Sequence, residues 1–330
     1  MSVDLGYVQD LAAGALAGRR LTVEEATVLL ACPPGSPAAE TIWEAARELA
    51  LRHAREGRIW AAIGVDYCPC PQNCSFCSFG EKWGIVRDSH EWSLEQIVAA
   101  GKSFAAQGAA FITIRTTQHY PLEQVCGIAE ALRAAIPGCP KLVINTGEFS
   151  AAEAEQLHAA GYSMAYHVFR MREGVDTGIS AKARLATLNV IHRSPLDLAF
   201  LAEPVGPEHT PAEIATEMVR ARDLDATLMG VMARVPVPGT PKAPLGALTP
   251  EQVAHAIAVS RLVAGTVADD ICVHPLNELA LQAGANAIVV ETGAVPRDRE
   301  EIAREWRGLT MDQAREILGR YYPTVAGTAA

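Results

Sequence analysis

The spacing of apolar and polar positions changes at about residue 59. Residues 1–58 are predicted to be helical, and Thr22 followed by Glu25 is typical of a capped helix start. A second helix in this region is predicted from about Ala39 to Arg55, after a Pro-Pro-Gly break. From residue 59 onward, a strand pattern and a helix pattern alternate along the chain.

Short apolar runs of strand length recur eight times after residue 59. The predicted strands are Ile59–Val65, Ala110–Arg115, Lys141–Thr146, Ser163–Phe169, Leu196–Leu201, Thr227–Arg234, Asp270–His274 and Asn286–Glu291. Helices are predicted between them near 94–107, 121–136, 151–160, 181–192, 211–224, 249–264 and 275–283. Several have clear starts, because Ser93 and Ser150 suit N-caps and Thr210 and Thr249 each precede a proline.

Alternating strands and helices predict an α/β fold with a parallel sheet. Eight such units in roughly 230 residues match the size of a (β/α)₈ TIM-type barrel, and a doubly wound open sheet is the alternative. We predict an N-terminal helical extension at 1–58, the barrel at 59–296, and a C-terminal helical cap and tail at 297–330, with the helical part at 297–323.

The composition narrows the range of partners. The chain has 330 residues, of which 49% are hydrophobic, and a formal net charge of −10 without a long basic run. We therefore expect no nucleic-acid or anionic-membrane partner. No apolar stretch reaches the length of a membrane span, and the N-terminus lacks the pattern of a signal peptide. The expected location is the cytoplasm.

Four of the eight cysteines lie within ten residues, directly after the first predicted strand. In a reducing cytoplasm such clustering indicates a metal site, not disulfides. Cys70, Cys74 and Cys77 have the spacing C-x₃-C-x₂-C, and Cys68 offers the alternative set C-x₅-C-x₂-C. Three thiolates on one short loop can hold a cubane cluster and leave one iron open. The loop would lie at the C-terminal face of a barrel, where active sites form.

This cysteine spacing, with Phe79-Gly80 after it, resembles the radical S-adenosylmethionine (SAM) superfamily. The resemblance implies a [4Fe–4S] cluster, SAM as cofactor, reductive cleavage to a 5′-deoxyadenosyl radical, a small-molecule substrate and a flavodoxin- or ferredoxin-type reductant. Superfamily frequency favours Cys70 as first ligand, whereas HmdB-type maturases use the longer spacing that Cys68 would give. A zinc-stabilised binding protein is a different interpretation, since four thiolates are available.

The helix near Leu21–Ala26 and the run Val235–Pro241 (VPVPGTP) resemble the biotin synthase branch, which includes HydE, methylornithine synthase and HmdB. Its members act in cofactor or amino-acid biosynthesis. Biotin synthase holds a second cluster with cysteines of inner barrel strands, but predicted strands two, three and five carry none here. A sulfur-inserting enzyme of the biotin or lipoyl synthase type is therefore the less favoured alternative. Residues Ala109–Thr116 also stand where members of this superfamily often carry a Gly-Gly-Glu signature that contacts SAM.

The resemblance and the strand ends together give the candidate site residues. Glu148, in Thr146-Gly147-Glu148, resembles a SAM-holding carboxylate of HydE-like proteins, and Arg170 and Arg172 could clamp the SAM carboxylate from one face of a strand. The further candidates for SAM binding are Tyr67, Phe76 and Glu208. The substrate candidates, taken from their positions at strand ends, are Arg115, Thr117, His119, Arg234, His274, Asn277 and Glu291.

Overall fold

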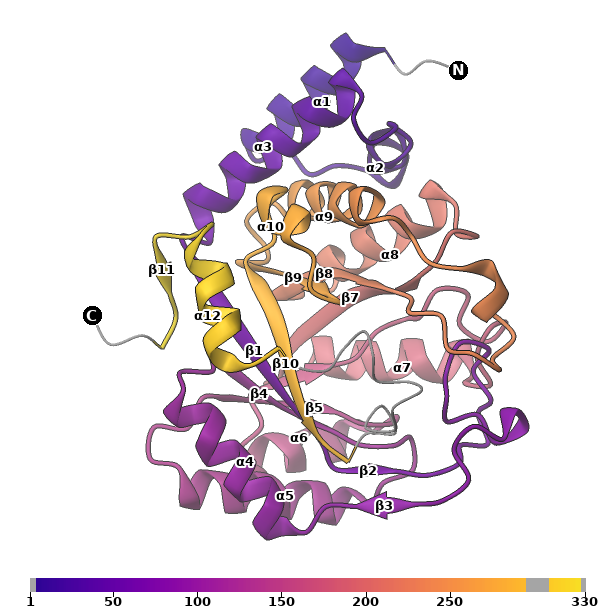
Figure 1. Cartoon of the computed structure of the whole chain (residues 1–330), viewed down its shortest axis with the longest axis vertical. Coiled ribbons are helices and arrows are strands. Elements are labelled where there is room, and N and C mark those ends of the chain that lie inside the picture. Colours follow the sequence, from indigo (N-terminus) through magenta and orange to yellow (C-terminus); the bar gives the residue numbers. More distant parts are fainter. Residues whose placement is uncertain (1–3, 295–308, 328–330) are drawn as a thin grey trace.

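A closed parallel barrel forms the centre of the computed structural model, which describes residues 4–294 and 309–327 (Figure 1). Eight parallel strands of the described residues follow each other around it in chain order, and the last pairs with the first. They are β1 (Glu56–Gly64), β4 (Phe111–Arg115), β5 (Lys141–Asn145), β6 (Met164–Tyr166), β7 (Asp197–Val205), β8 (Leu228–Ala233), β9 (Asp270–His274) and β10 (Ala287–Gly293). The predicted TIM-type barrel is confirmed, and the open-sheet alternative is wrong.

The seam between β1 and β10 closes the barrel. Their pairing runs in register from Arg58 opposite Ala287 to Gly64 opposite Gly293. A Cβ atom at Gly293 would lie 2.2 Å from the carbonyl oxygen of Gly64, and Gly293 has a φ of +110°. Only glycine fits where the two strands approach this closely.

All but the last of the connecting helices in the described residues begin within one residue of the predicted start. They are α4 (Leu94–Ala106), α5 (Leu122–Ala135), α6 (Ala151–Ala160), α7 (Ala181–His192), α8 (Pro211–Asp223), α9 (Pro250–Ala264) and α10 (Glu278–Gln282). The side chains of Ser93, Ser150, Thr210 and Thr249 each accept a hydrogen bond from a main-chain N–H of the first turn. Helix α10 starts three residues later than predicted, because Asn277 is its N-cap.

Elements from both ends of the chain pack outside the barrel. The N-terminal helices are α1 (Leu5–Leu16), α2 (Val23–Leu30) and α3 (Pro37–His53); α2 packs on α8, and α3 packs on α9 (Figure 1). Near the C-terminus lie α12 (Met311–Gly319) and β11 (Thr324–Val325), which pairs with the start of β1 and was not predicted. Residues 297–308 of the predicted cap lie outside the described residues, and the boundaries at 58 and 296 stay predictions.

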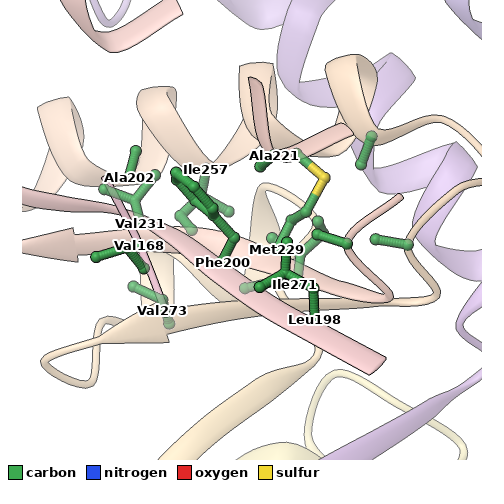
Figure 2. Close-up of a cluster of buried hydrophobic side chains, with 14 of the residues drawn as sticks. Val168, Leu198, Phe200, Ala202, Ala221, Met229, Val231, Ile257, Ile271 and Val273 are labelled. Atoms are coloured by element: carbon green, nitrogen blue, oxygen red, sulfur yellow. The ribbon is translucent and has the colours of Figure 1, made fainter. Parts of the chain in front are cut away.

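Side chains alternate between two apolar cores. Outward-facing residues of β7, β8 and β9, such as Phe200, Val231 and Ile271, pack against the surrounding helices, where Ile257 of α9 meets them (Figure 2). Inward-facing residues form a separate cluster that closes the lower part of the barrel, named the floor below. The floor consists of Trp60, Phe111, Val143, Met164, Ala199, Leu201, Leu228, Cys272 and Ala287.

Candidate active site

A cavity of about 540 Å³ opens above the floor, at the carboxyl ends of the strands. Trp60 and Leu201 belong to both the floor and the cavity wall. One or two side-chain steps further along the same strands, the inward positions become polar or charged. The polar residues that the strands contribute to the wall are Thr113, Arg115, Asn145, Tyr166, Glu203, His274 and Glu291.

The loop after β1 brings three thiols to this cavity. Cys70, Cys74 and Cys77 line it, together with Phe76 between them. Main-chain hydrogen bonds fold the loop on itself: the Cys70 N–H donates to Phe79 (2.6 Å) and the Cys77 N–H donates to the carbonyl of Cys74 (3.0 Å). Cys68 is not among the lining residues.

The three lining thiols have the chemistry that a cubane cluster requires. All are free cysteines, and among the described residues no other cysteine lines the cavity. Burial raises the pKa of the Cys74 thiol to about 11 and also raises that of Cys70, so both are neutral at pH 7 until a cation binds. Soft sulfur donors on one short loop suit iron–sulfur ligation, so these residues fit the cluster that the spacing implies.

A buried carboxylate that the sequence analysis missed lies at the cavity wall. Glu203 of β7 is 4% exposed; it accepts a hydrogen bond from the Tyr166 hydroxyl, and its Oε1 lies 3.9 Å from Nε of Arg170. Burial raises the pKa of Glu203, and burial together with this carboxylate raises the pKa of Tyr166. The predicted strand stops at Leu201, whereas β7 continues to Val205. The sequence feature that could have identified Glu203 is an acidic residue within an apolar run.

Of the predicted site residues, several meet at this one cavity. Besides Cys70, Cys74 and Cys77, they are Phe76, Arg115, Thr117, Arg170, Arg234, His274 and Glu291. Thr117 donates two hydrogen bonds to the carboxylate of Asp66 in β2 (Asp66–Tyr67), while Nη1 of Arg170 is buried without a hydrogen-bond partner among the described residues. Their roles in binding SAM or substrate stay predictions.

The structure does not bring the other predicted residues to the cavity wall. Arg172 has a left-handed backbone (φ +56°), so alternation with Arg170 fails, and its side chain pairs with Glu213 at 2.8 Å. The amide of Asn277 is occupied in capping α10. The others that lie outside the lining residues are Tyr67, Cys68, His119, Glu148 and Glu208.

Four of these outer residues have a local partner, namely Tyr67, His119, Glu148 and Glu208. Tyr67 pairs with His90 in the ribbon of β2 and β3 (His90–Glu91), and a ring nitrogen of His119 lies 3.4 Å from Gln72. Glu148 lies behind the wall, where it accepts a hydrogen bond from Gln118 and pairs with buried Arg184 at 3.0 Å. Glu208 pairs with Arg234. Glu148 and Glu208 are thus one side chain removed from the cavity.

Known proteins of two kinds are similar to this chain. A biotin synthase of Trichlorobacter lovleyi is 26% identical over 86% of this chain and 88% of its own, and one of Anaeromyxobacter is 28% identical over 74% and 68%. Crystal structures of the [FeFe]-hydrogenase maturase HydG (TM-score 0.80, 11% identity, 97% and 76% covered) and of methylornithine synthase, PylB (0.77, 16%, 96% and 97%), have the same fold. No family model matches the chain.

A full barrel with a three-cysteine loop at its carboxyl-terminal face, together with these relatives, defines a class: the chain is a radical SAM enzyme, with a [4Fe–4S] cluster and SAM as its cofactors. Within that superfamily its sequence is similar to biotin synthases, at 26% and 28% identity to the two named above. The zinc-stabilised, non-enzymatic interpretation is therefore wrong. Among the helices of residues 4–294 and 309–327, none has the length and apolar character needed to cross a membrane.

Proposed function

We propose that Cys70, Cys74 and Cys77 hold the cluster and that the radical made there acts on a small polar molecule in the same cavity. The observation that carries the proposal is that three thiols and a ring of polar strand residues line one cavity. When bound, the cluster supplies the electron that splits SAM into methionine and the 5′-deoxyadenosyl radical. The chain's own residues bind, orient and shield the reactants.

Cys70 is a better candidate than Cys68 for the first ligand. Cys70 forms a bridge with Gly80, and its carbonyl accepts a hydrogen bond from Glu81 N–H (3.2 Å), so the loop curls around it toward Cys77. Cys70 lines the cavity, whereas Cys68 precedes that curl and does not. Cys68 is then a neighbouring thiol outside the ligand set.

Arg170 is the best-placed residue to hold the SAM carboxylate. It lines the cavity close enough to Cys74 to lower the pKa of that thiol in part, against the larger effect of burial. Its buried Nη1 lacks a hydrogen-bond partner among the described residues. A guanidinium is planar and permanently charged, so it suits a carboxylate. Phe76, which lines the same cavity from the cysteine loop, is proposed to pack against SAM.

The substrate side of the cavity favours a hydrogen abstraction without sulfur insertion. The upper inward positions of β4, β5 and β7 are Arg115, Asn145 and Glu203, which offer nitrogen and oxygen instead of thiolate. These groups suit a small polar substrate. A rearrangement or maturation step in cofactor or amino-acid biosynthesis, as in methylornithine synthase, HydE or HmdB, fits this lining. Arg115, Thr117, Arg234, His274 and Glu291 are the proposed substrate contacts.

The sequence relatives favour a second candidate, because those reported above are named biotin synthases. A sulfur-inserting reaction would need a second cluster as sulfur donor. Cys272 is the inward-facing cysteine of the described strands, but it is fully buried in the floor, and burial raises the pKa of its thiol. This arrangement gives a second cluster poor support.

Anaerobic reconstitution separates the two candidates. We expect about four irons per chain, and formation of 5′-deoxyadenosine on incubation with dithionite and SAM. About eight irons per chain would favour the sulfur-inserting enzyme instead. A flavodoxin- or ferredoxin-type protein is the proposed physiological reductant, and the cytoplasm is the proposed location.

A further inference from the structure

Ser75, between Cys74 and Phe76, is held by two loops from the far side of the barrel mouth. Its N–H and its hydroxyl both donate to the main-chain carbonyl of Asp176, at 2.8 and 3.1 Å. Its own carbonyl accepts a hydrogen bond from the main-chain N–H of Lys242, at 3.0 Å. Asp176 lies in the loop before α7, and Lys242 lies in the loop between β8 and α9. Both main-chain groups of one residue inside the cysteine motif are thus bound by distant segments.

The side chains of the same two residues bind each other. Nζ of Lys242 lies 2.8 Å from the Asp176 carboxylate, and each side chain is 13% exposed. Nζ also lies 3.3 Å from Oε1 of Glu208, which pairs in turn with Arg234. A partly buried ion pair within a network is held more firmly than an exposed pair. The Asp176–Lys242 pair therefore joins the two loops that hold Ser75 and closes a ring of contacts around it.

We propose that the Asp176–Lys242 ion pair is a positioning device for the Cys74–Cys77 segment, an inference that rests on the ligand set proposed above. The pair fixes the distance between the two loops, and these loops fix Ser75 through its main chain. Cys74 and Cys77 are one and two residues away from Ser75, so their directions into the cavity depend on this attachment. Contacts that orient ligands without touching the metal commonly change metal affinity 10- to 100-fold, roughly, when removed.

A metal ion at the same place is the competing interpretation, since Asp176, Glu208 and His209 offer ligand atoms within 4.8 Å of one another. Two observations oppose it. The Lys242 ammonium already lies between the two carboxylates. The Nδ1 atom of His209 accepts a hydrogen bond from the Gly206 N–H (2.9 Å), so the proton of the neutral ring is on Nε2, which cannot then ligate. The cluster is therefore a charge network that joins loops.

The test compares iron retention in anaerobically reconstituted full-length protein. The variants are Asp176→Asn, Lys242→Met and their combination, with Lys102→Met as the matched control on the exposed surface of α4. We expect a ferrous chelator to extract iron roughly tenfold faster from each single variant. The combination should be no faster than the faster single variant, because both changes remove the same pair. Lys242→Arg, which keeps the charge, should restore slow release and the wild-type electron paramagnetic resonance signal.

Iron release from Asp176→Asn and Lys242→Met at the rate of Lys102→Met would overturn the inference. So would faster release accompanied by an equal loss of thermal stability in the metal-free protein, because the pair would then only stabilise the fold. Should Lys242→Met fail to fold, Asp176→Asn decides alone, since it is isosteric and keeps the carbonyl that binds Ser75. A wild-type protein without a cubane would contradict the proposed function itself, whereas a loaded wild type with unaffected variants contradicts this inference only.

Discussion

The lower and upper halves of the barrel interior are built by the same strands but have opposite character. Phe111, Ala199 and Cys272 are buried in the apolar floor, 4% exposed or less. Four residues further along β4 and β7, and two further along β9, the inward positions are Arg115, Glu203 and His274. Even steps keep a side chain on the same face of a strand, so apolar and charged layers lie one above the other.

This contrast shows how stability and chemistry share one set of strands. The close packing of apolar side chains in the floor stabilises the fold and closes the lower end of the barrel. The upper layer holds buried charges, which cost free energy unless they are paired. For Glu203 the hydrogen bond from Tyr166, the 3.9 Å approach of Arg170 and the charge of Arg184 offset part of that cost. We therefore expect substitutions in the floor to act mainly on the free energy of unfolding, and substitutions in the upper layer to act mainly on ligand binding.

Substitutions in the floor should cause the largest change, a loss in the free energy of unfolding. Leu228→Ala removes a fully buried side chain of β8, so it should lower the free energy of unfolding by about 3–4 kcal/mol. Leu94→Ala is the matched control, because Leu94 is 49% exposed at the start of α4 and should change stability by less than about 0.5 kcal/mol. Urea unfolding of both variants measures the difference. Equal losses would mean that the floor is not a packed layer.

Substitutions in the upper layer should have an intermediate effect, which is a weaker affinity for SAM. Arg170→Gln should weaken the affinity for SAM by roughly 10- to 100-fold, since a charged hydrogen-bonding group is lost. Arg172→Gln, two residues on, should have little effect, because that side chain pairs with Glu213 outside the cavity lining. Equilibrium dialysis of SAM against the reconstituted proteins makes the comparison. Equal weakening by both substitutions would contradict the placement of Arg172.

The smallest change should be in how stability depends on pH, with opposite signs for two glutamates near the barrel mouth. Burial raises the pKa of Glu203, so its ionised form costs stability above that pKa, and the cost disappears as the pH falls toward 4.5. Glu203→Gln should therefore unfold less readily than wild type at pH 7, and the advantage should vanish in acid.

The pKa of Glu208 is shifted in the opposite direction to that of Glu203. Burial alone would raise its pKa, but hydrogen bonds, chiefly from Arg234, lower it to about 2. A lowered pKa contributes stability above pH 4.5 that is lost as the pH falls toward 2. Glu208→Gln should accordingly be less stable than wild type at pH 7 and approach it in acid. Thermal unfolding from pH 3 to pH 7 tests both variants, and the same sign for both would refute the assignment.

Local patterns predicted the barrel well because its strands are short apolar runs separated by helices with clear N-caps, such as those at Ser93 and Thr249. The cysteine loop was predictable because the spacing of its cysteines is contained in one short segment. Long-range features were missed. β11 forms by pairing with Glu56 and Gly57, some 270 residues away in sequence. Glu203 was missed because the predicted strand stops at Leu201, two residues before it. Arg172 was misplaced because its left-handed backbone has no signal in a non-glycine residue.

The thiols that line the cavity, and not merely those near it, are proposed to make the SAM-cleaving site. Formation of 5′-deoxyadenosine from SAM and dithionite should be measured in reconstituted wild type, Cys70→Ala and Cys68→Ala. We expect the product to disappear in Cys70→Ala and to stay within about twofold of wild type in Cys68→Ala, because Cys70 lines the cavity and Cys68 does not. Loss in Cys68→Ala with survival in Cys70→Ala, or equal survival of both, would contradict this proposal.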